Sequence, residues 1–301
     1  MIKHYTVAEH TFSLEMSDTC PVWQMLANYN PFEVAAGTRE LFCLHVLSDT
    51  TPIFKESEAH HVLTDSSDDD MPRIELYEQG GGYLFRVAHL KNAAVCCEME
   101  TDSDFSSARL VVFENAVRHL GRFPIDNALM LLYAFSTARM KTLEMHASVV
   151  IKDGRCQLFL GKSGTGKSTH TRQWLSLFSD ARLLNDDNPI VRFSETEKTW
   201  YAYGSPWSGK TPCYVNDKAP IAAFVLIKQA PFNRCRLLAL PEAYAAVYSS
   251  TSGLRCNRRM ADGLYEAVAG VVTTVPCYGL ECLPNTDAAR VCYNEIQAHS
   301  L

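Results

Sequence analysis

The chain has 301 residues, 47% of them hydrophobic, which is enough to build a core in one large domain or in two of ordinary size. Its 34 acidic residues outnumber the 28 lysines and arginines, and the formal charge of -6 gives no electrostatic reason to expect nucleic acid or an anionic membrane surface as a partner. Residues 1–10 lack the apolar segment of a signal peptide, and no later stretch has the roughly eighteen apolar residues of a membrane span. We therefore expect a cytoplasmic protein without membrane contact.

Eleven cysteines are spread along the chain, mostly inside apolar segments, and no two of them form a Cys-x-x-Cys pair. Secreted disulfide frameworks and most structural zinc sites show closely spaced cysteines. The pattern therefore predicts reduced thiols that act as small core residues, with a structural zinc site as the alternative.

Residues 40 to 115 are typical of a β-rich region. Short apolar or alternating runs are separated by turn signals, which favours antiparallel strands. The expected strands are residues 41–46, 74–77, 83–87, 94–97 and 110–113.

Two connections in this region differ in character. The three glycines 80–82 predict a hairpin turn, because glycine adopts the positive φ angles that tight turns need. Residues 65–70 read Asp-Ser-Ser-Asp-Asp-Asp, and we interpret them as a solvated loop rather than a metal site, since nothing orders the carboxylates.

A helix is expected to follow, opened by Pro124 and Asp126 and apolar on two sides through Phe135. Such a helix is buried, and we place it between two halves of the chain. The predicted division is a β-rich region of unknown role over residues 1–120 and a second domain over residues 121–301.

A hairpin introduces the main motif of the second domain. Residues 145–152 and 156–160 flank Asp153-Gly154, a strong two-residue turn signal. The strand at 156–160 therefore has an antiparallel neighbour. This favours an α/β domain on a mixed, largely antiparallel sheet over the parallel sheet of GTPase-type proteins.

Directly after this strand, residues 161–169 read Gly-Lys-Ser-Gly-Thr-Gly-Lys-Ser-Thr, a complete Gly-x-x-x-x-Gly-Lys-Ser phosphate loop. Its glycines let the backbone N–H groups turn inward toward a polyphosphate. The expected ligand is ATP or a close relative. The residues expected to contact it are Gly161, Lys162, Ser163, Gly164, Thr165, Gly166, Lys167, Ser168 and Thr169.

Within the loop, Lys167 is expected to reach the β- and γ-phosphates and Ser168 to offer its hydroxyl to Mg²⁺. A helix beginning near Ser168 adds its positive N-terminal end. Along that helix, Trp174, Leu175 and Phe178 share one face, as a helix packed on a sheet requires.

A second polar group follows about twenty residues later, where an apolar strand ends in Asn185-Asp186-Asp187. Adjacent strand residues point to opposite faces unless the backbone turns, as the following Asn188-Pro189 suggests. One carboxylate can hold Mg²⁺, and the other can accept a proton from an attacking hydroxyl. The alternative is a turn whose side chains only form hydrogen bonds with the local backbone and take no part in catalysis.

Two further segments carry polar groups. Residues 203–210 end in Lys210, which is expected either to steady the γ-phosphate or an anionic substrate, or to lie in a surface turn. Arg255, Arg258 and Arg259 are candidates for neutralising a transferred phosphoryl group, with an exposed basic loop as the alternative.

Over roughly residues 140 to 215 the chain resembles HPr serine kinase/phosphorylase and the related ATP-dependent phosphoenolpyruvate carboxykinases. The resemblance rests on His146-Ala147-Ser148, the Asp-Gly hairpin, the phosphate loop and Asn185-Asp186-Asp187, in that order. It implies that Lys167 and Ser168 serve phosphate and magnesium, that Asp186 and Asp187 are the general base and the metal-linked acid, and that His146 assists them. Lys162 and Ala147 stand where the kinases have aspartate and glycine.

The sequence thus predicts an ATP- and Mg²⁺-dependent phosphotransferase that moves the γ-phosphoryl group to a protein hydroxyl or a small acceptor. Its catalytic residues are expected to be Asp186, Asp187, His146 and Lys210, with Ser168 and Asp187 at the metal. Two alternatives stay open, a non-catalytic ATP-binding protein that recognises a partner and a carboxykinase-type lyase. Whether the chain forms a homo-oligomer is also left open.

Overall fold

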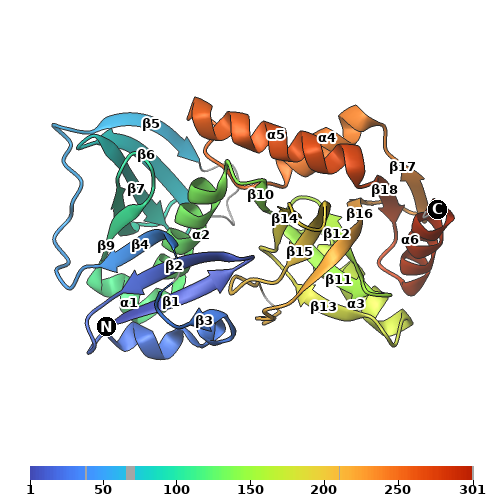
Figure 1. The fold of residues 1–301 in the computed structure, drawn as a ribbon, viewed down its shortest axis with the longest axis horizontal. Helices are drawn as coiled ribbons and strands as arrows, with labels where there is room; N and C mark the ends of the chain where they lie inside the picture. Colours follow the sequence, from blue (N-terminus) through green and yellow to red (C-terminus); the bar gives the residue numbers. More distant parts are fainter. Residues whose placement is uncertain (38, 66–71, 210, 300–301) are drawn as a thin grey trace. The chain divides into compact units, whose positions relative to one another are not determined.

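The computed structural model describes residues 1–37, 39–65, 72–209 and 211–299. Contacts within the chain define two compact units, Met1–Ser136 and Thr137–Leu301, and each unit is built on its own sheet (Figure 1). The mixed α/β class is therefore confirmed, with a β-rich first unit. No helix in the described ranges has both the length and the apolar composition needed to cross a membrane.

The first unit contains nine strands in the part of the chain that the structure describes, with two short 3-10 helices and two α-helices. The strands are β1 (Ile2–Val7), β2 (His10–Glu15), β3 (Glu33–Val34), β4 (Glu40–Val46), β5 (His60–Asp65), β6 (Arg73–Gln79), β7 (Gly82–Ala88), β8 (Val95–Thr101) and β9 (Ser107–Val112). The helices are η1 (Pro21–Met25), η2 (Ala27–Phe32), α1 (Glu114–Leu120) and α2 (Phe123–Thr137).

These strands form one sheet in the order β3-β1-β2-β4-β9-β8-β7-β6-β5. The five strands expected between residues 40 and 115 are present as β4, β6, β7, β8 and β9. The antiparallel prediction is wrong for β4, which pairs in parallel with β2 on one side and with β9 on the other. Long connections separate β4 from both partners in the sequence, and parallel pairing needs such crossovers.

Tight turns set the register of the hairpins. Gly80 and Gly81, with φ of 64° and 83°, join β6 to β7 with Gln79 opposite Gly82, as the glycine run predicts. The β1–β2 turn has the same geometry without glycine, since Ala8 and Glu9 have φ of 45° and 64°. This turn therefore leaves no glycine or asparagine signal in the sequence. Of the acidic loop at 65–70, only Asp65 is described, and the rest lies outside the described residues.

Helix α2 packs on the sheet of the first unit. Tyr133 is fully buried and donates a hydrogen bond to the Val7 carbonyl at 2.9 Å, and its ring contacts Phe12. Phe135 stacks on Phe85 of β7. The helix is buried, as expected from its two-sided apolar pattern. Because its contacts are with this sheet, the division falls after Ser136, later than the predicted boundary near residue 120.

The second unit contains the remaining strands β10 (Thr142–Glu144), β11 (Ala147–Lys152), β12 (Arg155–Leu160), β13 (Arg182–Asn185), β14 (Ile190–Ser194), β15 (Thr199–Tyr203), β16 (Lys218–Gln229), β17 (Arg234–Leu237) and β18 (Cys277–Cys282). Its helices are α3 (Lys167–Leu177), α4 (Leu240–Ser249), α5 (Arg258–Thr274) and α6 (Thr286–Ala298).

The second sheet is mixed and largely antiparallel. Its main path runs β10-β14-β15-β16-β12-β11-β13, and among the described strands only the β12–β16 and β16–β18 pairs are parallel. The predicted hairpin joins β11 to β12, with Lys152 opposite Arg155 and positive φ at Asp153 and Gly154. This hairpin delivers the end of β12, at Leu160, to the phosphate loop.

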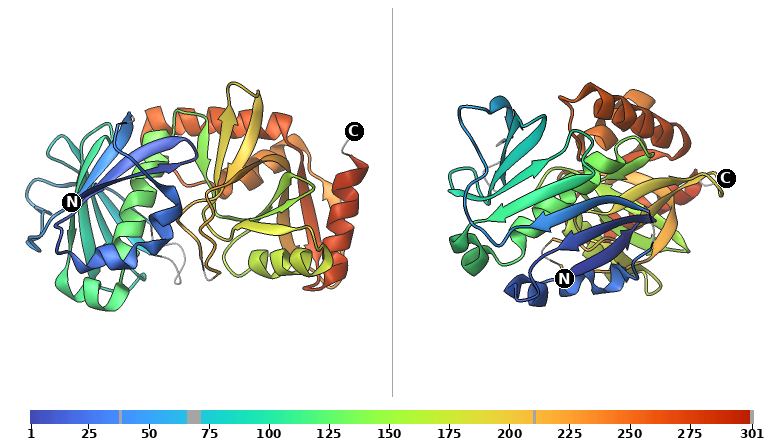
Figure 2. Two further views of the ribbon diagram at one scale, coloured as in Figure 1. Left: turned by 60° about the horizontal axis from the view of Figure 1, so that its bottom comes forward. Right: turned by 60° about the vertical axis from the view of Figure 1, so that its left-hand side comes forward.

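Helices cover both faces of this sheet (Figures 1 and 2). Val149 and Ile151 of β11 pack in one cluster with α4 and α5, whereas Val150, which points the other way, packs with α3 and α6. On α3 the fully buried Trp174 fills the second cluster, together with Leu177 and Phe178. Leu177 thus takes the place on this face that the sequence assigned to Leu175.

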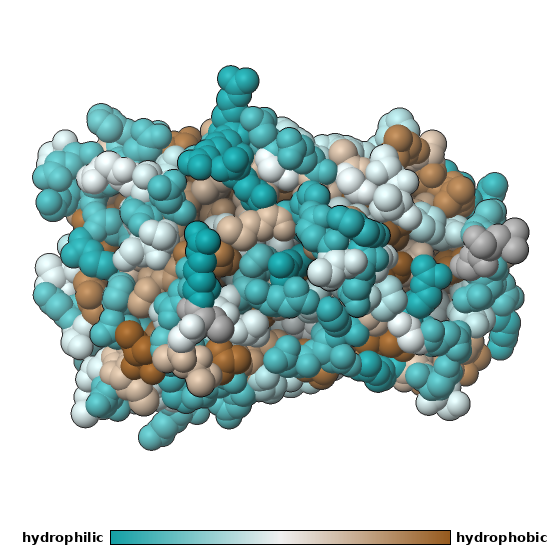
Figure 3. All heavy atoms as spheres, viewed as in Figure 1, coloured by the Kyte–Doolittle hydropathy of each residue, from teal (hydrophilic) through white to brown (hydrophobic). Residues whose placement is uncertain are grey.

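All eleven cysteines are free thiols, and seven of them are buried, as the absence of Cys-x-x-Cys pairs predicts. The face of the molecule in Figure 3 is mostly hydrophilic, with hydrophobic residues singly or in small groups. Such scattered apolar residues are normal on protein surfaces.

Candidate nucleotide-binding site

The loop between β12 and α3 has the backbone that its glycine spacing predicts. Gly161, Gly164 and Gly166 have φ of 146°, 77° and 103°, a region that other residues rarely adopt. At Gly161 a Cβ atom would also lie 2.6 Å from the Thr165 hydroxyl oxygen, whereas at Gly164 and Gly166 it would meet no atom within 4 Å. The loop is therefore open beside its two later glycines.

Lys167, the first residue of α3, points its ammonium group back into the loop. Its Nζ donates to the carbonyl oxygens of Gly161 at 2.9 Å and Lys162 at 3.3 Å, and it lies 2.8 Å from His146 Nε2. Burial lowers the pKa of Lys167, while the charges of Asp187 and Asp186 act in the opposite direction. The two acids thus help to keep a partly desolvated ammonium charged.

His146 connects this lysine to one of the acids. It lies just before β11, where its backbone N–H donates to the Ser250 carbonyl at 2.7 Å. On the other side of its ring, Nδ1 is 3.2 Å from Asp187 Oδ1. Because a charged ammonium only donates, Nε2 accepts from Lys167 and the imidazole proton sits on Nδ1, facing Asp187. Lys167, His146 and Asp187 therefore form a continuous row, with a hydrogen bond between the first two and an ion-pair contact between the last two.

The two acids follow the end of β13 at Asn185, where the backbone turns. Asn185 Oδ1 accepts a hydrogen bond from the Asp187 N–H at 2.9 Å, and its amide donates to the Ser205 hydroxyl and the Trp207 carbonyl. The turn gives the neighbouring acids different surroundings. Asp186 is 7% exposed, whereas the Asp187 side chain is 32% exposed.

Asp186 is anchored to two other elements. Ser148 of β11 donates a short hydrogen bond to Asp186 Oδ1, and the Ser148 hydroxyl accepts from the Thr171 hydroxyl of α3 at 2.9 Å. The three side chains are buried, so this network fixes the position of the strand end relative to the loop helix. Neither Ser148 nor Thr171 was predicted from the sequence to have a role at the site. Ser148 could have been found from strand alternation, because it stands two residues after His146.

Glu144 of β10 is a further acid that the sequence analysis missed. It is 3% exposed, and its Oε2 accepts no hydrogen bond from the described residues. Burial, with a smaller contribution from the charge of Asp187, raises the pKa of Glu144 to about 8. The sequence could have pointed to Glu144, because it is a lone glutamate in an apolar strand and lies two residues before His146.

A pocket of about 540 Å³ opens beside the loop. Four of the predicted nucleotide-binding residues line it, Gly164, Thr165, Gly166 and Thr169, and the opposite wall comes from the ends of β16 and β18. His170 also lines it. Burial lowers the pKa of His170 to about 4, and its Nε2 accepts from Trp174 Nε1 at 2.9 Å, so this histidine is neutral near pH 7.

The segment after β15, residues 204–209, lies against Asp186 and Asp187, and its contacts mainly fix the positions of the neighbouring strand ends. Ser205 is fully buried and donates to the Asn188 carbonyl at 2.6 Å, and Trp207 is also buried. Ser205 is therefore part of the folded core and is not accessible to a substrate. A Cβ atom at Gly209 would lie 3.3 Å from the Asp187 carboxyl carbon, so glycine allows this close approach. Lys210 lies outside the described residues.

The arginines near the start of α5 contact protein groups or solvent. Arg255 donates to the carbonyl oxygens of Tyr248 at 3.1 Å and Thr251 at 2.9 Å, and its guanidinium lies over the Tyr248 ring. The Arg258 side chain is 96% exposed. Arg255 therefore has a structural use at the end of α4, and the geometry gives Arg258 no partner at the loop.

Comparisons with known proteins add little to this geometry. No family model matches the sequence, and no curated protein sequence matches it. Among solved structures, the chain is similar to the Hpr(Ser) kinase/phosphatase from Coxiella burnetii, with 10% sequence identity and a TM-score of 0.30. The similarity covers 52% of this chain and 89% of that one. A TM-score of this size establishes no relationship, so the function has to be argued from the site itself.

Proposed function

We propose that the second unit is an ATP-dependent phosphotransferase, which moves the γ-phosphoryl group to a hydroxyl or carboxylate of a protein or small-molecule acceptor. The observation that carries this proposal is the row Lys167–His146–Asp187 beside a glycine loop with an adjoining pocket. The row unites a cation for phosphate with a base and an acid, the groups that phosphoryl transfer needs.

Lys167 has the first role. Its present acceptors are two loop carbonyls and His146 Nε2, all of which are weaker partners for an ammonium than a polyphosphate. A nucleotide in the loop would therefore draw Lys167 toward the β- and γ-phosphates. The lysine would offset phosphate charge, and His146 would lose its hydrogen-bond donor.

His146 and Asp187 then supply the base. With Lys167 withdrawn, the Nε2 lone pair is free to accept the proton of an acceptor hydroxyl, while Asp187 holds the Nδ1–H tautomer and stabilises the imidazolium that forms. Asp186 is buried against Ser148, and we assign it a positioning role. This proposal refines the roles that the resemblance implied, in which one of the two aspartates is the base.

The residues present fit a magnesium ion. Mg²⁺ prefers oxygen ligands, and it would neutralise charge on the transferred phosphate. Ser168 has a hydroxyl that makes no hydrogen bond to another described residue, and Asp187 is partly exposed. We propose that these two side chains hold the ion when the nucleotide is bound.

Replacing Lys167 by alanine tests the proposal directly. Calorimetric titration in Mg²⁺ should compare a non-hydrolysable ATP analogue with adenosine, which lacks phosphates. Losing charge-assisted hydrogen bonds should weaken binding of the analogue about 10- to 100-fold. Adenosine should bind with unchanged affinity, because Lys167 is expected to contact only the phosphates.

Lys198→Ala is the matched control. Lys198 lies in the turn between β14 and β15, its side chain is 71% exposed, and it pairs with Glu195. Its removal should leave both affinities unchanged. Equal losses for the analogue and for adenosine in Lys167→Ala would show that the substitution damages the unit rather than a phosphate contact, and would contradict the proposal.

A further inference from the structure

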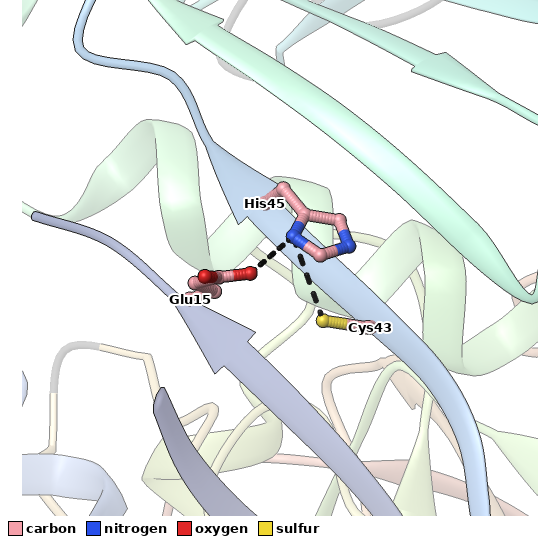
Figure 4. A group of neighbouring side chains, drawn as sticks. All are labelled: Glu15, Cys43 and His45. Carbon is pink, nitrogen blue, oxygen red and sulfur yellow. Dashed lines mark hydrogen bonds and ion pairs between the residues drawn. The ribbon is translucent and has the colours of Figure 1, made fainter. Parts of the chain in front are cut away.

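A second polar cluster lies in the first unit, on one face of its sheet. Strands β2 and β4 pair in parallel, with Ser13 opposite Cys43 and Glu15 opposite His45. Because strand side chains alternate, Cys43 and His45 point to the same face. Figure 4 shows their side chains turned toward Glu15 across the strand pair.

The atoms of this cluster that can bind a metal lie close together. His45 Nδ1 is 2.5 Å from Glu15 Oε2 and 3.9 Å from Cys43 Sγ, and the three ligand atoms all lie within 4.8 Å of one another. Around tetrahedral zinc, with bonds of about 2.0–2.3 Å, neighbouring ligand atoms are roughly 3.3–3.7 Å apart. Small side-chain rotations therefore suffice to place all three around one ion.

The charges of the cluster also favour a divalent cation. A thiolate and one carboxylate together neutralise the charge of a divalent cation. The His45 and Glu15 side chains are 39% and 44% exposed, so an ion can enter.

A second layer of hydrogen bonds supports one of the ligands, because Ser13 forms a hydrogen bond with Cys43. Ser13, which faces Cys43, donates to Glu40 Oε2 at 2.6 Å, and His4 Nδ1 lies 2.6 Å from Glu40 Oε1. Outer partners of this kind orient ligands in known metal sites. They also distinguish this cluster from isolated surface acids, whose side chains have no fixed direction.

We propose that Glu15, Cys43 and His45 form a zinc-binding site in the first unit, with a water molecule completing the tetrahedron. One oxygen, one sulfur and one nitrogen ligand suit zinc, a borderline-soft ion, and exclude magnesium, which requires oxygen ligands. This site belongs to the first unit, whereas the proposed nucleotide site belongs to the second. The proposed zinc site uses a Cys-x-His spacing on a strand, which the search for Cys-x-x-Cys pairs could not detect.

Cobalt substitution in the full-length chain tests this proposal. Co²⁺ bound to one thiolate gives a sulfur-to-metal charge-transfer band in the near ultraviolet, which reports sulfur ligation specifically. Titrating the wild type with Co²⁺ should produce this band, and adding Zn²⁺ should remove it. In Cys43→Ser the band should be lost, and Zn²⁺ affinity, measured by competition with a chromophoric chelator, should fall by about 100-fold or more.

Cys20→Ser is the matched control, because Cys20 is another half-buried free thiol of the same unit and lies outside the cluster. It should keep the band and the zinc affinity. His45→Asn, which retains the thiol, should also weaken zinc binding, and circular dichroism should show that each variant is folded. A wild type without the band, or a band of equal intensity in Cys43→Ser, would overturn the proposal.

Discussion

The two sheets of this protein differ in what covers them, and the difference determines where their polar groups lie. The second sheet is enclosed by helices on both faces, so strands such as β12 and β16 carry long runs of buried residues. The first sheet packs aromatic residues and α2 on one face, and its other face carries Glu15, Cys43 and His45.

A sheet with two buried faces places most of its charged side chains where its strands end. His146 precedes β11, the loop follows β12 and Asp187 follows β13, so the three groups meet at one edge. A sheet with one polar face can instead place ligands along its strands, as Cys43 and His45 do on β4. The two proposed sites thus follow from two kinds of strand environment.

Asp187→Asn should have the largest effect, because it alters the strand-end site while keeping its shape. Asparagine cannot stabilise the imidazolium of His146 and permits the wrong tautomer, so turnover should fall about 10²- to 10⁴-fold. The measurement is phosphate release from γ-labelled ATP in Mg²⁺, with water as the acceptor. Affinity for the non-hydrolysable analogue should fall far less than turnover, because Lys167, Ser168 and the loop backbone would still hold the phosphates and the ion.

Asp180→Asn is the control for this substitution. Asp180 pairs with Lys152 at the hairpin end of β11, opposite to the end that carries His146. It should keep full turnover. If Asp187→Asn also keeps full turnover, the second unit binds ATP without catalysis, and the alternative of a regulatory nucleotide-binding protein is preferred.

The next smaller effect is expected for Glu144→Gln, which should change how the free energy of unfolding depends on pH. The pKa of Glu144 is about 8 in the folded chain, above the ordinary value of 4.5, so the native state holds this proton more tightly. The stabilisation is complete below about pH 4.5 and is lost as the pH rises through 8, at a limiting rate of about 1.4 kcal/mol per pH unit. The variant should lack this contribution, as urea unfolding between pH 5 and pH 8 would show.

The exposed Glu195 gives a matched comparison. Hydrogen bonds from Lys141 and Lys198 lower its pKa below the ordinary 4.5, so it stays ionised across this range. Glu195→Gln should therefore follow the pH dependence of the wild type. If Glu144→Gln does so too, Glu144 does not hold its proton in the native state.

The sequence was most informative where local chemistry alone determines the structure. The glycines of the phosphate loop, the Asp153-Gly154 turn and the apolar run of β12 each specify their own backbone, and these elements were predicted correctly. The turn at Asn185 was also predicted, because proline follows two residues after Asp187. The loop, the strand end and their order along the chain could therefore be predicted before any coordinates.

Contacts between distant segments could not be predicted in this way. The hydrogen bond from Ser148 to Asp186 and the pairing of β2 with β4 depend on tertiary packing, which leaves no periodic signal. The Ala8-Glu9 turn adopts a glycine-like backbone with ordinary residues, so β1 and β2 went unrecognised. As a result, the cluster at Glu15 became visible only in the folded chain.

The smallest predicted effect concerns a feature that both sheets have, a two-residue hairpin turn with positive φ angles. Gly81 and Gly154 have φ of 83° and 73°, and a Cβ atom at either would meet nothing within 4 Å. Alanine at each position should therefore destabilise its hairpin only through backbone strain, by about 1 kcal/mol. This change should make amide hydrogen exchange through local opening of the hairpin about fivefold faster. Gly81→Ala should accelerate exchange in β6 and β7 alone, and Gly154→Ala in β11 and β12 alone. If either substitution accelerated exchange in both hairpins equally, the two units would open together. The two sheets would then differ in the side chains on their faces, but they would not unfold independently of one another.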